Sequence, residues 1–138
     1  GFYHTCGVRT DSTLACWGRY ADRQATPPDG TFTAVSAGFY HTCGVRTDST
    51  LACWGLNEDG QATPPSGTFA TVSAGTLHTC GVRTDSVLAC WGWNEHGQAT
   101  PPSGTFATVS ASHHHTCGIR TDGVLVCWGR GPRVMPKG

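Results

Sequence analysis

Residues 41–55 read His-Thr-Cys-Gly-Val-Arg-Thr-Asp-Ser-Thr-Leu-Ala-Cys-Trp-Gly, and this stretch decides the fold because the chain contains it four times. The copies begin at four histidines spaced 37 residues apart, His4, His41, His78 and His115. A fixed period of this size indicates a repeat architecture, in which each repeat is one supersecondary unit. One such unit cannot bury its apolar face alone, so the sequence predicts that neighbouring copies pack on one another.

Each copy has the pattern of a β-hairpin. Side chains alternate in character along residues 41–46 and again along residues 51–54, which is the period of a β-strand. Between the two runs, residues 47–50 are Thr-Asp-Ser-Thr, a composition that favours a turn. The Arg-x-Asp pair beside each turn is expected to be an Asp that caps the turn next to a solvated Arg.

The turn sets the register of the hairpin and therefore the pairing of the cysteines. Folding about Asp48 places Val45 opposite Leu51. It also places Cys43 opposite Cys53. Directly opposed side chains on antiparallel strands have Cβ atoms roughly 4.5–5.5 Å apart, which is close to the spacing that a disulfide needs. The predicted disulfides are Cys6–Cys16, Cys43–Cys53, Cys80–Cys90 and Cys117–Cys127.

The eight cysteines, two in each repeat, indicate an oxidising compartment. A zinc site is one alternative, because His41, Cys43 and Cys53 would share one face of the hairpin. Structural zinc sites, however, use four ligands and closely spaced cysteine pairs, and here no fourth ligand repeats. Free buried thiols are the other alternative. Disulfides are the favoured interpretation, and no cofactor is expected.

Length and composition narrow the class of protein. The chain has 138 residues, enough for one domain with a core. Only 13% of them are charged and the formal net charge is zero, which is unlike the basic footprint of a nucleic-acid binder. No apolar run reaches the roughly 20 residues of a membrane span. The chain starts within a repeat and without a signal peptide, which suggests a processed chain or part of a longer one.

The repeats continue through the rest of the chain as short strands and proline-bearing links. A third strand is predicted after each of the first three hairpins, at residues 31–37, 68–74 and 105–111, and no stretch has helical periodicity. We therefore expect an all-β fold of about four tandem three-stranded repeats in a single repeat domain, residues 1–138. The approximate units are 1–37, 38–74, 75–111 and 112–138, the last of which lacks one strand.

The consensus Ser-Ala-Gly-x-x-His-Thr-Cys-Gly-Val-Arg-Thr-Asp-x-x-Leu-x-Cys-Trp-Gly-x-Asn-x-x-Gly-Gln resembles the regulator of chromosome condensation repeat. In the second copy the matching residues are Gly38, His41, Thr42, Asp48, Leu51, Trp54, Gly55, Asn57, Gly60 and Gln61. The resemblance covers essentially the whole chain.

The resemblance implies propeller-blade repeats, commonly seven to a ring. About three and three-quarter units do not close such a ring, so the chain is expected to form part of a β-propeller or an open repeat array. The cysteine-paired, Thr-Pro-Pro-containing form is similar to secreted or surface bacterial members, which implies an extracellular or cell-surface location. Nucleotide exchange by the nuclear member depends on an inserted wedge, and this chain has no such insertion.

Two residues recur once in each repeat and are assigned to repeat packing. The histidines are expected to be half-buried and hydrogen-bonded to neighbouring backbone: His4, His41, His78 and His115. The tryptophans after the second cysteine are expected to pack between adjacent sheets: Trp17, Trp54, Trp91 and Trp128. The alternative for the histidines is a ring of metal-binding or proton-handling groups. The alternative for the tryptophans is a row of exposed aromatic residues that bind a ligand.

The run His113-His114-His115 replaces Phe-Tyr-His or Thr-Leu-His of other copies, and short His tracts can bind metal ions. In a strand His113 and His115 would share a face, but a site needs further ligands, so they are weak candidates and no metal is expected. Two adjacent carboxylates occur at Glu58-Asp59, in a connector, and the next copy does not keep them. Without a nucleophile, phosphate or metalloprotease motif, the chain is not expected to be an enzyme.

The sequence favours a non-enzymatic, extracellular, self-assembling structural protein, a component of a ring or filament. Its partners would be other copies of itself or the remainder of a longer chain, because repeating units with open ends can propagate. The alternative is a propeller module that recognises a protein partner through its connector loops, like the β-lactamase-inhibiting member of the family. The connectors differ at few positions, such as Leu56 against Trp93, which weighs against the alternative.

Overall fold

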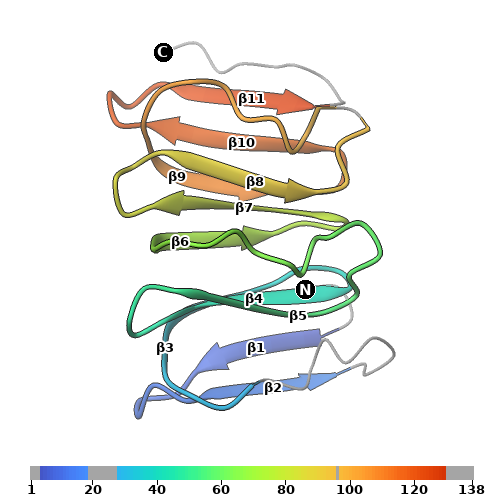
Figure 1. The fold of residues 1–138 in the computed structure, drawn as a ribbon, viewed down its shortest axis with the longest axis vertical. Helices are drawn as coiled ribbons and strands as arrows, with labels where there is room; N and C mark the ends of the chain where they lie inside the picture. Colours follow the sequence, from blue (N-terminus) through green and yellow to red (C-terminus); the bar gives the residue numbers. More distant parts are fainter. Residues whose placement is uncertain (1–3, 19–27, 96, 130–138) are drawn as a thin grey trace.

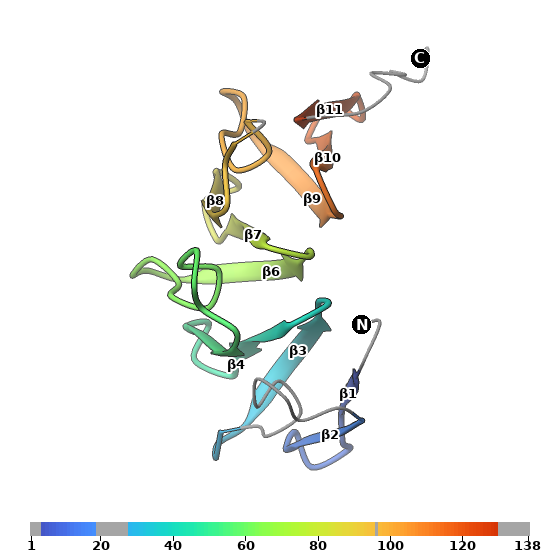
Figure 2. The same cartoon turned by 90° about the vertical axis from the view of Figure 1, so that its right-hand side faces the viewer.

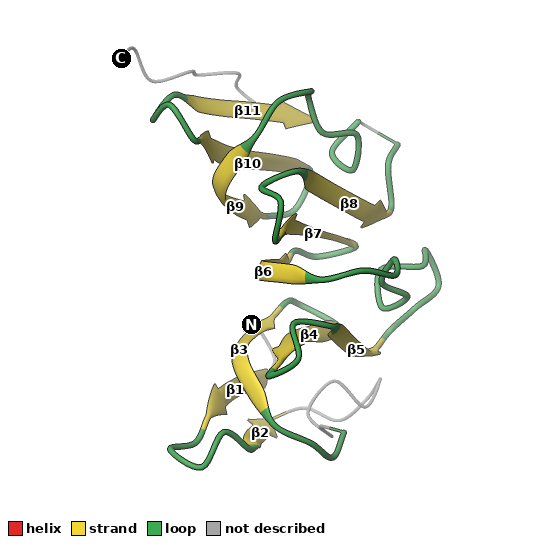
Figure 3. Ribbon diagram, turned by 60° about the vertical axis from the view of Figure 1, so that its left-hand side comes forward, coloured by secondary structure: helices red, strands yellow, loops and turns green. Residues whose placement is uncertain are grey.

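The computed structural model describes residues 4–18, 28–95 and 97–129, and within them every regular element is a β-strand (Figures 1 and 3). The strands are β1 (His4–Val8), β2 (Leu14–Gly18), β3 (Phe32–Ala37), β4 (His41–Arg46), β5 (Leu51–Gly55), β6 (Phe69–Ala74), β7 (His78–Arg83), β8 (Leu88–Gly92), β9 (Phe106–Ala111), β10 (His115–Arg120) and β11 (Leu125–Gly129). None of this part of the chain forms a helix of the length and apolarity that a membrane crossing requires.

The strands form four antiparallel sheets that follow one another along the molecule like successive blades (Figure 1). Three sheets have three strands, in the orders β3-β4-β5, β6-β7-β8 and β9-β10-β11, and the β1-β2 sheet has two. The all-β prediction and the propeller-type repeats are therefore confirmed.

The blades are offset from the repeat units expected from the sequence. The strand after each hairpin was expected to complete the unit of that hairpin, but β3 pairs with β4 and not with β2. The reason is the length of the connections: only residues 38–40 join β3 to β4, whereas a long connector precedes β3. Among the described strands, the sheet that lacks one strand is consequently the first and not the last.

Each hairpin has the register that the sequence predicted. In the second blade Val45 lies opposite Leu51 and Cys43 opposite Cys53. The other three hairpins have the same register. Every cysteine is bonded within its own hairpin, in the pairs Cys6–Cys16, Cys43–Cys53, Cys80–Cys90 and Cys117–Cys127. The paired Cα atoms are 4.0–4.1 Å apart, so each disulfide links strands that already lie side by side.

The core of each complete blade is a phenylalanine seated on a glycine. Phe32 is fully buried, and a Cβ atom added at Gly44 would lie 2.7 Å from its ring. The guanidinium group of Arg46 lies over this ring, 5.1 Å from its centroid. The same arrangement recurs with Phe69 and Phe106. Glycine is thus required at the position of the middle strand against which the phenylalanine ring packs.

The hairpin turns connect each blade to the next. Oδ1 of Asp48 accepts hydrogen bonds from the amide and the hydroxyl of Thr50, which hold the pKa of this carboxyl below its usual value. Ser49 follows with φ 72°, in the left-handed region, and its carbonyl accepts a hydrogen bond of 2.8 Å from the amide of Phe69. The turn therefore orients a backbone acceptor toward the first strand of the following blade.

Candidate functional site

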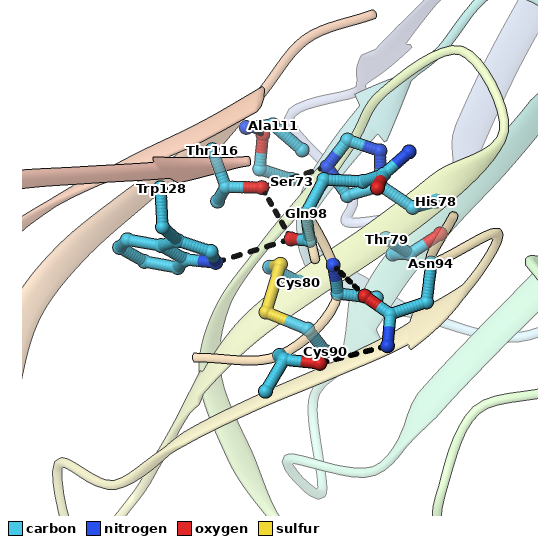
Figure 4. Close-up of a disulfide and its surroundings, with 12 residues drawn as sticks. Ser73, His78, Thr79, Cys80, Cys90, Asn94, Gln98, Ala111, Thr116 and Trp128 are labelled. Atoms are coloured by element: carbon cyan, nitrogen blue, oxygen red, sulfur yellow. Dashed lines mark hydrogen bonds between the residues drawn. A yellow bond between two sulfur atoms is a disulfide. The ribbon is translucent and has the colours of Figure 1, made fainter. Parts of the chain in front are cut away.

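A buried hydrogen-bond network joins consecutive blades. Nε2 of His41 lies 2.7 Å from Oγ1 of Thr79, and the Thr79 hydroxyl donates to the backbone carbonyl of Gln61. The indole of Trp91 donates to the same carbonyl at 3.0 Å. We call these residues and their equivalents the interblade network. Figure 4 shows its next copy beside the Cys80–Cys90 disulfide.

The network fixes the tautomer of its histidine. Because the only hydroxyl proton of Thr79 goes to the Gln61 carbonyl, Nε2 of His41 is the donor in the contact with Thr79. The ring is fully buried, and its Nδ1 has no hydrogen-bond partner among the residues that the structure describes. Burial lowers the pKa of His41 to about 3 and that of His78 to about 4. Both rings are therefore neutral at physiological pH.

The packing residues lie where the sequence suggested, with different partners and different exposure. The histidines bond to a threonine side chain of the next repeat and not to backbone: His4 to Thr42, His41 to Thr79, and His78 to Thr116. His115 is exposed, because no described blade follows it. Trp17 is 56% exposed at the other end, whereas Trp54, Trp91 and Trp128 are half-buried.

The half-buried tryptophans pack edge-to-face on the core phenylalanine of their own sheet, with ring centroids 6.0–6.3 Å apart. The indole of Trp128, like that of Trp91, also reaches the preceding connector, where its Nε1 donates to the Gln98 carbonyl at 3.1 Å. Trp91 and Trp128 therefore each link the inside of one blade to the connector that enters it.

Sequence reasoning missed the threonine and the glutamine of the network. The signal was recurrence within this chain: Thr follows His in all four copies, and Gln recurs at positions 24, 61 and 98, but neither was assigned a role. Thr79 and Gln61 are both fully buried although they are polar. The Thr79 hydroxyl donates to the Gln61 carbonyl, and the side-chain oxygen of Gln61 accepts from the amide of Asp59, whereas Nε2 of Gln61 has no hydrogen-bond partner among the described residues.

The weak metal candidates do not form a site. His113 lies in the turn before β10, not in a strand, so it does not share a strand face with His115 as expected. Nδ1 of His113 lies 2.8 Å from Oγ1 of Thr76, while the ring of His115 contacts Ser112. Among the described residues, no group of three or more His, Cys, Asp or Glu side chains is placed to hold a metal ion. Glu58 and Asp59 are exposed in a connector.

Several of the positions at which the repeats differ come together in space. The turns that lead into β4, β7 and β10 carry Phe-Tyr at 39–40, Thr-Leu at 76–77 and His-His at 113–114. These turns follow strands whose carboxyl ends converge, as Figure 2 shows for β3, β6 and β9. Trp93, the variant residue of a connector, lies with its ring centroid 5.4 Å from that of His114. We call these seven residues the variable rim.

A hollow of about 400 Å³ lies at the variable rim. Its floor is formed by the small residues that end the three strands, at 37–38, 74–75 and 111–112, and its wall by Phe39, Thr76 and His113. The rings of Phe39 and His113 meet edge-to-face with centroids 4.4 Å apart, although they belong to blades that are not neighbours. The hollow therefore spans three blades.

The floor of the hollow is held by close backbone contacts. The amide of Phe39 donates to the Gly75 carbonyl, and the amide of Thr76 donates to the Ser112 carbonyl. A Cβ atom at Gly38 would lie 2.3 Å from the Gly75 carbonyl oxygen, and one at Gly75 would lie 2.4 Å from that of Ser112. The two glycines let adjacent blades approach closely enough for three turns to share one hollow.

Comparison with solved structures places the fold among known propellers. The entire ectodomain of the receptor kinase CR4 from Physcomitrella patens is similar, with 28% identity and a TM-score of 0.84 over 99% of this chain and 42% of that one. The CRINKLY WD40 ectodomain of the Arabidopsis thaliana receptor kinase ACR4 is similar with 29% identity and a TM-score of 0.77, over 99% of this chain and 50% of that one. Yeast RCC1 (Prp20), solved with Kap60 bound to it, has 16% identity and a TM-score of 0.80, over 95% of this chain and 42% of that one. At this identity the likeness is one of fold alone.

The chain spans at most half the length of these structures. No match was found among curated protein sequences. The model of the regulator of chromosome condensation (RCC1) repeat matches residues 32–61, 69–98 and 106–133, which together make up more than half of the chain. Together with the blades and their conserved spacing, this match shows that the chain belongs to the RCC1 repeat family.

Proposed function

We propose that this chain is a non-enzymatic, protein-binding propeller module that works outside the cell and recognises its partner through the variable rim. One observation carries the proposal. The repeats are nearly identical wherever they pack on one another, and they diverge in the residues that surround the hollow. Binding surfaces need different side chains at equivalent positions, whereas packing surfaces need the same ones.

Two further observations support the class of partner and the location. Structures of the yeast relative describe its complex with Kap60 and its binding to Gsp1p and histones, which are all proteins. The four disulfides and the likeness to two plant receptor ectodomains favour an oxidising, extracellular setting for this chain. A bacterial source is an expectation of the sequence resemblance only.

Site-specific photo-crosslinking tests the binding face. A benzophenone amino acid at Leu77, on the variable rim, should crosslink to one or a few proteins from the extracellular fraction of the source organism. The matched control carries the same group at Val87, an exposed residue in the hairpin turn at the other end of the same blade. Excess unlabelled chain should suppress the product. Equal crosslinking from both positions, or none from Leu77, would overturn the proposal.

Self-assembly into a ring or filament is the second candidate, and the two end blades favour it. His115, exposed on the last blade, is the equivalent of the network histidines, and Thr5, exposed on the first blade, is the equivalent of their threonine partners. A second copy, or a further blade of the same chain, would complete that contact. Light scattering tests it: a particle well above 14.5 kDa that dissociates in a His115→Ala variant supports association, and a monomer at all concentrations rejects it.

A further inference from the structure

We propose that the hollow at the variable rim receives an uncharged aromatic side chain, the indole of a tryptophan or the phenol of a tyrosine, from the protein partner. This inference rests on the proposed function and names the chemistry of its contact. Three features of the hollow carry it: its size, the absence of charge in its lining, and the arrangement of rings and polar atoms around it.

The size suits one large side chain. A volume of about 400 Å³ falls within the range of roughly 300–1,000 Å³ that ligand pockets occupy. The floor consists of alanine, glycine and serine, so no long side chain of the described residues that form it fills the space. Energetically dominant residues at protein interfaces are most often Trp, Tyr and Arg, seated in pockets of the partner.

The lining of the hollow favours Trp or Tyr over Arg as the side chain that enters it. Of the described residues that surround the hollow, none is Asp, Glu, Lys or Arg. A guanidinium group placed there would lose its water without gaining a carboxylate partner from the lining. A neutral ring loses little on entering and gains the contact area of the floor.

The walls supply ring contacts and a polar atom. Phe39 and His113 already meet at an interplanar angle of 70°, so a third ring beside them extends an edge-to-face cluster, a geometry that aromatic pairs prefer. Nδ1 of His113 lies 2.8 Å from Oγ1 of Thr76. In the tautomer in which Nδ1–H donates to Thr76, Nε2 is an acceptor for an indole N–H or a phenol O–H. A purely aliphatic side chain would use the floor but not these groups.

The test is an NMR titration of the full chain with neutral amino-acid amides. N-acetyl-tryptophanamide and N-acetyl-tyrosinamide should shift the backbone amides of Gly38, Gly75 and Thr76 in a saturable way. The expected dissociation constant is roughly 0.1–1 mM, given the binding free energy typical of ligands of this size. N-acetyl-leucinamide and N-acetyl-argininamide should bind at least several-fold more weakly.

Two variants and one control make the test specific. Thr76→Phe introduces the residue found at the equivalent Phe39 and should fill the hollow, weakening tryptophanamide binding at least tenfold. His113→Phe keeps a ring but removes Nε2, so it should reduce the preference for the tryptophan amide over its N-methylindole analogue. Val87→Thr introduces the residue of the equivalent Thr50 at the far turn and should leave binding unchanged.

Several outcomes would overturn the inference. These are shifts located away from the variable rim, equal binding of the leucine amide, stronger binding of the arginine amide, or unchanged binding in Thr76→Phe. Failure here is distinguishable from failure of the proposed function. Crosslinking of a partner at Leu77 without any binding of aromatic amides would reject this inference and leave the protein-binding proposal intact.

Discussion

The imidazole of His41 is held neutral by its burial, and its one proton joins two blades. Nε2–H is used on Thr79, the ring is fully buried, and burial lowers its pKa to about 3. A group whose pKa is lower in the folded than in the unfolded state keeps full stability above its unfolded pKa, here 6.5. As the pH falls below that value, the histidine is protonated in the unfolded chain but not in the folded chain. The free energy of unfolding therefore decreases until the pH reaches the folded pKa.

We therefore predict that the free energy of unfolding declines between pH 6.5 and about 4. Each buried histidine contributes about 1.4 kcal/mol per pH unit, so His41 and His78 together should remove several kcal/mol over this window. Carboxyls such as Asp48, with a pKa below 3.8, contribute only at lower pH. Urea unfolding at a series of pH values measures the slope.

The slope should decrease in His41→Gln, which removes one of the titrating groups. Absolute stability will also differ between this variant and the native chain, so the comparison uses the slope alone. An equal slope in His41→Gln and in the native chain would contradict the linkage.

The hydroxyl of Thr79 completes the network between two blades, and Thr79→Val should reveal its contribution. Valine keeps the shape but leaves the buried Nε2–H of His41 without an acceptor, whereas the Gln61 carbonyl still accepts from Trp91. Leaving one buried donor unpaired costs about 1–3 kcal/mol. Thr71→Val, at an exposed strand position of the same blade, is the control and should change stability by less than about 0.5 kcal/mol. Chemical denaturation of the two variants gives the comparison.

At the scale of the element, the hairpins could be derived from the sequence because their determinants are local. The alternation of residues 41–46, the turn around Asp48 and the spacing of Cys43 and Cys53 all lie within one short segment, and together they fix the register. The partner of β3 could not be read in the same way, because strand pairing depends on which connection is shorter. A strand after a hairpin looks like part of that hairpin until the three-residue link to β4 is compared with the long connector before β3.

The hairpin turn holds a non-glycine residue in a strained left-handed conformation, except in the last repeat, where this residue is glycine. Ser49 and Ser86 adopt φ values of 72° and 71°, whereas the equivalent position in the last blade is Gly123. A residue with a Cβ atom in this region costs roughly 1–2 kcal/mol, part of which is offset by the greater freedom of glycine in the unfolded chain. We predict that Ser86→Gly stabilises the chain by about 0.5–1 kcal/mol and that Gly123→Ser destabilises it by a similar amount. Thermal unfolding of both variants measures the two shifts, and a lower melting temperature for Ser86→Gly would contradict the argument.

At the scale of the whole molecule, the hollow was not predictable because it is assembled from three repeats. The change from Phe39 to Thr76 to His113 was visible in the sequence, but nothing local indicates that residues 37 positions apart meet. Their meeting depends on the convergence of β3, β6 and β9, which follows from the curvature of the stacked blades (Figure 2). Of the connectors, which the sequence offered as the recognition loops of a protein-binding module, Trp93 lies beside His114 at the variable rim.

This curvature depends on how closely two turns approach, so it can be altered at one glycine. A methyl group at Gly75 would lie 2.4 Å from the Ser112 carbonyl oxygen, and a backbone oxygen cannot move aside without separating the third blade from the fourth. We predict that Gly75→Ala breaks the hydrogen bond from the Thr76 amide to that carbonyl and raises the hydrogen-exchange rate of the Thr76 amide at least tenfold. Gly7→Ala is the control, because a Cβ atom there meets nothing within 4 Å.

Since the hollow lies at the contact between Gly75 and Ser112, Gly75→Ala should also lose binding at the variable rim. Its disulfides and hairpins should stay intact, which hydrogen exchange of the hairpin amides would establish in the same experiment. Unchanged exchange at Thr76 would mean that the blades tolerate a wider spacing, and that the glycine does not control the shape of the molecule.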